Sequence, residues 1–288
     1  MFKQGLFWGS VVFLVFLFLF AVIGPFKYDI TESVGRPFEP PSSQFWLGTD
    51  EIGRDIFSRL AYGARISLSI GFAVVSVAIF IALLIGTTAG YGKRWVDNLL
   101  MRFTDGMFAF PDILLAILII GIIGATDVGQ VFPWLGFLGE RVLAALPVFA
   151  ALVVVGWPGM ARLVRNQVLA LKEREFVLAS RALGAGHKHI VFRHILPHLF
   201  GLISAVAMVE MAMIVLAESS LSFLGIGIQQ PYPSWGAMIN DARTSMASQP
   251  LPLLWPCLAL SLTILSLNFV GDGLRDRFDP HLRNARAK

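Results

Sequence analysis

Two carboxylates interrupt an otherwise apolar stretch and are the first residues that could do chemistry. Glu210 and Glu218 are the only charged residues between positions 199 and 223. Eight residues apart on a helix, they lie within about 80° of one another around its axis. A carboxylate inside a membrane could contact an ammonium group of a transported molecule or keep a polar pathway hydrated. Met211 and Ile214 would border that pathway. Both carboxylates could instead accept hydrogen bonds from neighbouring helices or be protonated, and the residue types leave these interpretations open.

Other groups of reactive residues do not form a recognisable site. The histidines at 187, 189, 194 and 198 stand in a basic segment without carboxylate or thiolate neighbours, and Cys257 is the only cysteine, so we expect no metal. The chain contains no Gly-x-x-x-x-Gly-Lys-Ser/Thr sequence and cannot hydrolyse ATP through that motif. Ser219 and Ser220 form no nucleophile–base–acid set with the histidines. We therefore predict that the chain is not an enzyme and has no cofactor of its own.

The composition requires a lipid environment. Of the 288 residues, 56% are hydrophobic and 15% are charged, and one soluble core cannot bury that much apolar surface. A membrane-spanning helix needs about 20 apolar residues. We predict an all-α integral membrane protein with six transmembrane helices, over residues 7–23, 66–89, 103–124, 142–160, 199–223 and 253–270. The first run could instead be a signal peptide, although its end is a poor cleavage site.

Basic residues are distributed unevenly between the two sides of these helices. If the N-terminus is cytoplasmic, the cytoplasmic segments hold 16 of the 23 Lys and Arg residues. Cytoplasmic loops carry such an excess, so both termini are expected in the cytoplasm. The basic composition therefore does not indicate nucleic-acid binding.

A long outer segment precedes the second predicted span. Its prolines at 37, 40 and 41 predict an extended strap. From Asp50 onward, apolar residues at helical spacing alternate with Arg54, Asp55 and Arg59, which predicts an amphipathic helix at the membrane interface. This helix could anchor the bundle or dock an outside partner, and both remain open.

Small residues and prolines mark special positions within the predicted spans. Gly86 and Gly90 have the spacing that lets another helix approach closely. Pro111 and Pro256 predict interruptions, and helices with such breaks tend to line a bundle interior or a cavity.

Residues 165–197 predict a cytoplasmic elbow of two short helices. Gly184 and Gly186 suit a tight turn between them, and the second helix is expected to end near Pro197. An elbow of this kind could fit a groove on another protein, with Phe176 and Leu183 as apolar anchors. It could equally lie on anionic lipid through its Arg and Lys residues.

The elbow resembles a motif of a known family. Ala179-Ser-Arg-Ala-Leu-Gly184 with Ile195-Leu-Pro197 is similar to the EAA loop of ABC importer permeases, which reads Glu-Ala-Ala, three residues, Gly, nine residues, Ile-x-Leu-Pro. Four positions match in register: Ala179, Gly184, Leu196 and Pro197. Three positions depart from the pattern: Leu178 replaces the acidic residue, Ser180 the second alanine and His194 the isoleucine. The turn and the helix start are retained, whereas an ion pair from the first position is not.

Further motifs resemble the C-type permease subunit of the dipeptide and oligopeptide branch. They are Leu47-Gly-Thr-Asp50, Gly53-Arg-Asp55, Ser58-Arg59, Gly63-Ala-Arg-Ile-Ser-Leu68, Glu218-Ser-Ser-Leu-Ser-Phe-Leu-Gly225, Pro233-Ser-Trp-Gly236, Gly271-Asp-Gly-Leu-Arg-Asp276 and Asp279-Pro280. Together they cover the chain from about residue 45 to 282, in an order that is highly specific.

The resemblance implies one permease subunit of an importer in the cytoplasmic membrane, with a type I ABC importer permease core. The implied partners are a second homologous permease, two ATPases that bind ATP and Mg²⁺, and an extracytoplasmic substrate-binding protein. The elbow would seat in a groove on one ATPase, and closure of the ATPases would switch the helices between inward-open and outward-open states. The implied coupling residues are Glu175, Phe176, Ala179, Ser180, Arg181, Ala182, Leu183 and Gly184.

The sequence leaves the cargo open. Dipeptides or oligopeptides lead, and nickel chelates, glutathione, opines or sugars are alternatives for the same machinery. An ion-coupled carrier or a membrane-embedded hydrolase would belong to other classes. We divide the chain into an N-terminal helix with strap and interfacial helix (1–65), a permease core with the coupling loop (66–275) and a cytoplasmic tail (276–288).

Overall fold

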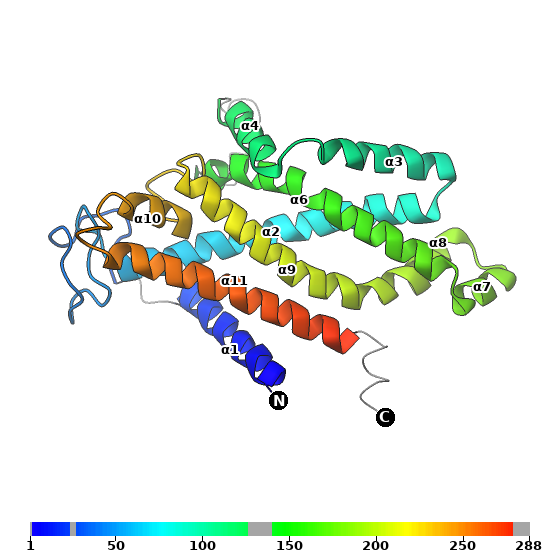
Figure 1. Ribbon diagram of the computed structural model, residues 1–288, viewed down its shortest axis with the longest axis horizontal. Coiled ribbons are helices and arrows are strands. Elements are labelled where there is room, and N and C mark those ends of the chain that lie inside the picture. The colour runs from blue at the N-terminus through cyan, green and yellow to red at the C-terminus, as the bar shows by residue number, and fades with distance from the viewer. Residues whose placement is uncertain (1, 24–26, 126–139, 279–288) are drawn as a thin grey trace.

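The computed structural model describes residues 2–23, 27–125 and 140–278, and the regular structure within them is helical. Long helices run roughly along one axis, with α10 and the strap at one end and α7 and α8 at the other (Figure 1). The elements are α1 (Phe2–Ile23), α2 (Ile56–Tyr91), α3 (Arg94–Met107), α4 (Asp112–Gly124), α6 (Glu140–Lys172), α7 (Glu175–Ala182), α8 (His187–Ile190), the π-helical turn η2 (Val191–Ile195), α9 (Leu196–Phe223), α10 (Trp235–Ala242) and α11 (Leu251–Phe278).

Five of the described helices are long and apolar enough to cross a membrane, and α3 with α4 forms a sixth candidate span if that bent pair counts as one. The prediction of one helix over 103–124 is therefore wrong in shape, because α3 and α4 meet at 85°. Pro111 lies in the break and directly precedes α4. Proline lacks an N–H and disfavours helical geometry in the residue before it, so the chain turns here.

The predicted interfacial helix is not a separate element. Residues 50–54 form turns, and α2 begins at Ile56 and continues to Tyr91 without interruption. The Asp55 side chain accepts a hydrogen bond from the Ser58 N–H and caps the first turn. The expected division between residues 65 and 66 therefore falls inside one continuous helix.

The close approach predicted at Gly86 and Gly90 is present between α2 and α6. A Cβ atom added at Gly86 would lie 2.7 Å from the Ala161 carbonyl oxygen and 2.7 Å from Val164 Cβ. One added at Gly90 would lie 2.8 Å from Val168 Cβ. Real Cβ atoms do not come so close, so only glycine permits this packing.

The remaining spans pack around this pair. α9 lies against both α2 and α11, and α11 also contacts α1 (Figure 1). The fourth expected span is longer than predicted, since α6 continues past Met160 to Lys172 and contains Pro147 and Pro158. This extension carries the helix to the elbow, where it ends.

Candidate functional site: the elbow, the α9 carboxylates and the outer cap

The turn of the elbow has the geometry that its glycine predicts. Gly184 has φ +87°, a conformation that residues with a side chain rarely adopt. The Leu183 N–H donates to the Ala179 carbonyl at 3.0 Å, and the Ala185 N–H donates to the Ser180 carbonyl at 3.1 Å. These bonds satisfy the last carbonyls of α7 and reverse the chain toward α8.

Both helices of the elbow differ from prediction in their boundaries. The first is split, because α6 ends at Lys172 and α7 begins at Glu175. The second does not end at Pro197, since α8 passes through the π-helical turn η2 into α9. In this wide turn the Leu196 N–H donates to the Val191 carbonyl, five residues back. Such a turn accommodates a proline ring whose missing N–H would disrupt an ordinary α-helix.

The elbow is fixed to the bundle by one face and exposes the other. Val177 is fully buried in a cluster with Val168, Ile190 and Ile195. The Phe176 ring stacks on the His198 imidazole with centroids 4.7 Å apart. Leu183 is 89% exposed at the tip. Of the predicted coupling residues, Ser180 is half-buried and the others are exposed: Glu175, Phe176, Ala179, Arg181, Ala182, Leu183 and Gly184.

Two ion pairs that the sequence analysis missed join α3 to α6 near the elbow end. Arg165 Nη2 lies 2.5 Å from Asp97 Oδ2 and its Nε lies 2.9 Å from Asp97 Oδ1. Arg162 pairs with Asp105, and its guanidinium lies over the Phe108 ring at 4.1 Å. These contacts hold the bent α3–α4 segment against the core.

Glu218 is fully buried among hydroxyl groups. Ser67 Oγ on α2 donates to Glu218 Oε2 at 3.0 Å, and Ser222 Oγ donates to Oε1 at 2.8 Å. Ser219 Oγ lies 3.4 Å from Oε2. This carboxyl group therefore joins α9 to α2, which is the hydrogen-bonding interpretation that the sequence left open.

The other α9 residues face different surroundings. Glu210 is half-buried, and no hydrogen bond to it is found within the described part of the chain. Met211 lies next to Gly71 of α2, and Ile214 is buried in the core with Val74. Of the four predicted pathway residues, Ile214 and Glu218 are buried, whereas Glu210 and Met211 are half-buried.

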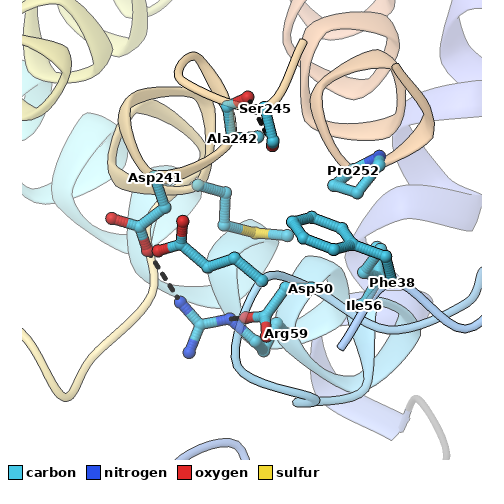
Figure 2. Close-up of a pocket in the computed structure, with 10 residues that line it drawn as sticks. Phe38, Asp50, Ile56, Arg59, Asp241, Ala242, Ser245 and Pro252 are labelled. Atoms are coloured by element: carbon cyan, nitrogen blue, oxygen red, sulfur yellow. Dashed lines mark hydrogen bonds and ion pairs between the residues drawn. The ribbon is translucent and has the colours of Figure 1, made fainter. Parts of the chain in front are cut away.

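An ion network closes the end of the bundle opposite the elbow, and we call it the outer cap: Asp50, Arg54, Arg59 and Asp241. Figure 2 shows Asp241 and Asp50 on either side of the Arg59 guanidinium. Arg54 Nε lies 2.6 Å from Asp50 Oδ2, and both arginine side chains are 3% exposed. The network joins the strap to α10, and burial of these arginines contradicts the predicted polar interfacial face.

Glu51 lines a small cavity of about 20 Å³ beside this network. Burial raises the pKa of the Glu51 carboxyl above its ordinary value, and the nearby charges of Asp241 and Asp50 raise it further. Arg54 and Arg59 act in the opposite direction.

Among the described residues, no group of three or more His, Cys, Asp or Glu side chains could hold a metal ion. The histidines of the elbow instead pack with aromatic rings, as Tyr91 does against His187 with centroids 5.4 Å apart.

Membrane-length helices with an exposed elbow at one end and an ion network at the other define a multi-pass helical membrane protein. The chain belongs to the family of binding-protein-dependent transport system inner membrane components, whose family model matches residues 78–284. The family predicted from the sequence motifs taken together is therefore confirmed, and the chain is a transport permease component of the inner membrane.

Similar proteins agree with this family. The glutathione transport system permease protein GsiD of Pectobacterium atrosepticum is 42% identical over 259 residues, covering 90% of this chain and 78% of that protein. The dipeptide transport system permease protein DppC of Bacillus subtilis is 39% identical over 285 residues, covering 98% and 83%. Inward-facing MetNI, a methionine ABC transporter, matches 76% of this chain and 96% of its own with a TM-score of 0.59 at 18% identity, which shows the fold.

Replacing Glu218 is expected to destabilise the protein. Glu218→Leu removes the acceptor of the Ser67 and Ser222 hydroxyls, and each buried polar group left unsatisfied costs about 1–3 kcal/mol. Glu218→Gln retains one oxygen acceptor and should lose less. The measurement is the thermal unfolding midpoint of the purified protein, with Glu210→Leu as the matched control. Equal losses in Glu218→Leu and Glu210→Leu would contradict the assigned role.

Replacing Glu51 is expected to stabilise the protein in a pH-dependent way. Because the folded-state pKa of Glu51 is raised, its contribution to stability is present at low pH and is lost as the pH rises through that value. Glu51→Gln should therefore raise the unfolding midpoint at neutral pH, and the gain should shrink toward the ordinary carboxyl pKa. A gain that does not change with pH, or an equal gain in the exposed control Glu32→Gln, would exclude this explanation.

Proposed function

We propose that the chain forms half of the translocation pathway of an ATP-driven importer of short peptides. The similarity to both a dipeptide permease and a glutathione permease supports this cargo, since glutathione is itself a small peptide. Dipeptides or oligopeptides remain the leading cargo. Glutathione is the second candidate, because the glutathione permease of Pectobacterium atrosepticum is 42% identical to this chain.

The exposed surface of the elbow supports the proposal that a partner subunit hydrolyses ATP. It presents an apolar tip at Leu183, and its other face is fixed to the bundle through Val177. A surface that is exposed yet rigidly supported can receive force from a partner and pass it to α6 and α9. The proposed coupling residues are the eight that the family resemblance implies: Glu175, Phe176, Ala179, Ser180, Arg181, Ala182, Leu183 and Gly184. ATP and Mg²⁺ would be held by two ATPase subunits.

The proposed orientation places the elbow and both termini in the cytoplasm. The elbow end carries exposed cationic side chains such as Arg174, Lys188 and Arg193, and cytoplasmic segments are enriched in such residues. The outer cap then faces the extracytoplasmic side. A substrate-binding protein would deliver cargo there, and a second homologous permease would complete the pathway.

Glu210 is the better candidate for a pathway residue. Its half-buried carboxyl group makes no described hydrogen bond and could meet an ammonium group of a peptide, whereas the Glu218 carboxyl is occupied by serine hydroxyls. Met211 and Ile214 would contribute packing beside it.

Co-purification tests the proposal directly. Two ATPase subunits and a second permease should accompany the chain in detergent, whereas an ion-coupled carrier would purify without them. Labelling of Ala182→Cys in a Cys257→Ser background should require a reagent that reaches the cytoplasm. Labelling from outside the cell, or absence of any ATPase from the complex, would reject the proposal.

Substitution at the elbow turn is expected to uncouple ATP hydrolysis from uptake. Gly184→Val places a β-branched residue at φ +87°, which costs about 1–3 kcal/mol and should distort the turn. Gly186→Val is the matched control, since Gly186 has φ −73° and an added Cβ meets no atom within 4 Å at either position. In proteoliposomes, the ratio of cargo imported to ATP hydrolysed should fall severalfold for Gly184→Val alone. Equal ratios in both variants would contradict the role of the turn.

A further inference from the structure

A polar cavity lies between the elbow and the inner ends of α2 and α6, and we call it the elbow cavity. Its volume is about 330 Å³. The residues that line it come from α2, α6, α7, α8 and the turn before α8: Tyr91, Lys172, Arg181, Ala185, His187 and Ile190. We propose that the elbow cavity binds a phosphate-class oxyanion from the cytoplasm, either inorganic phosphate or a small phosphorylated molecule.

The charges around the elbow cavity favour an anion. Lys172 and Arg181 both line it, and no carboxylate does. Lys172 Nζ donates to the Gly90 carbonyl at 3.3 Å, and Arg181 Nη2 donates to the Tyr91 hydroxyl at 3.3 Å. Both acceptors are neutral and both bonds are long, so neither cation is neutralised by its protein partner.

Several other arginines of the chain have the carboxylate partner that Arg181 lacks among the described residues. Arg54, Arg59, Arg162 and Arg165 each pair with an aspartate. In the part of the chain that the structure describes, neither Lys172 nor Arg181 forms an ion pair. Two cations that face a shared cavity without a carboxylate make the charge-assisted donors that phosphate oxygens prefer.

The position along α6 favours a soluble anion over a lipid headgroup. Lys172 lies ten residues beyond Arg162, which is about 15 Å along an α-helix. The headgroup layer on each side of the hydrocarbon is only about 5–8 Å thick. Arg162 and Arg165 are the first charged residues of α6 beyond its apolar part, so Lys172 lies past the headgroups. The cytoplasmic source of the anion rests on the orientation in the proposed function.

A bound anion would join elements that move relative to one another if the elbow transmits force. It would bridge Arg181 on α7 to Lys172 on α6, next to the turn at Gly184. The elbow would become stiffer when the site is filled, so cytoplasmic phosphate compounds would tune its response.

Direct binding of inorganic phosphate tests the site. The protein, with whatever subunits accompany it, is placed in nanodiscs of zwitterionic lipid, and phosphate is titrated at constant ionic strength while its ³¹P resonance is monitored. Saturable binding is expected. Lys172→Gln and Arg181→Gln should each weaken it about tenfold or more, because each removes a charge-assisted donor. Arg174→Gln and Lys188→Gln remove the same charge from exposed positions outside the lining and should bind as the parent protein does.

Three results would overturn the proposal. They are non-saturable broadening, equal weakening in the control variants, and binding that appears only with phosphatidylglycerol in the nanodisc. The last result would assign the site to a lipid headgroup. Neither ATP nor cargo is present in the assay, so failure of the site and failure of the proposed transport function are separate outcomes. Lys172 lies outside the proposed coupling residues, so Lys172→Gln decides the question even if Arg181→Gln impairs assembly.

Discussion

The contact between α2 and α6 holds the described structure together. Gly86 and Gly90 allow the two backbones to approach until Val164 and Val168 fill the space that a side chain would occupy. α2 is thereby fixed along the bundle axis, and its other contacts are placed by that packing. At one end it carries Arg59 into the outer cap, and at the other end Tyr91 borders the elbow cavity. Lipid supplies no hydrophobic force between helices, so van der Waals packing of this kind must hold them together.

Polar contacts inside the bundle add specificity to this packing. Glu218 of α9 meets Ser67 near the start of α2, and Arg165 near the elbow end of α6 meets Asp97 of α3. The Glu218 contact is fully buried, so leaving its hydroxyl donors without an acceptor would cost about 1–3 kcal/mol each. Arg165 and Asp97 are partly exposed, so their pair contributes less to stability. Helices that could otherwise slide past one another are held in one register.

Much of the fold could be predicted because lipid imposes simple rules. Apolar length identified the helices, the spacing of Gly86 and Gly90 identified a close contact, and Gly184 identified a turn. Boundaries were less predictable, since they depend on single side chains. Pro111 bends a segment whose composition reads as one span, and Asp55 starts α2 ten residues before the apolar run begins.

The ion network and the serine contacts could not be predicted, because their members are far apart in the sequence. Asp241 reaches Arg54 across 187 residues, and Ser67 reaches Glu218 across 151. An arginine-rich helical pattern is typical of a solvated face, and only folding reveals that the arginines point inward. The elbow cavity likewise forms only where four helices and the turn before α8 meet, so the sequence shows its two cations but not that they face one cavity.

The length of α2 has a mechanical consequence. Its 36 residues form a continuous rod of about 54 Å. A tilt of roughly 5° about one end displaces the opposite end by roughly 5 Å, as for any rod of that length. A lever of this kind converts a small rotation at the elbow end into a shift the width of a side chain at the opposite end, without any bend in the helix itself.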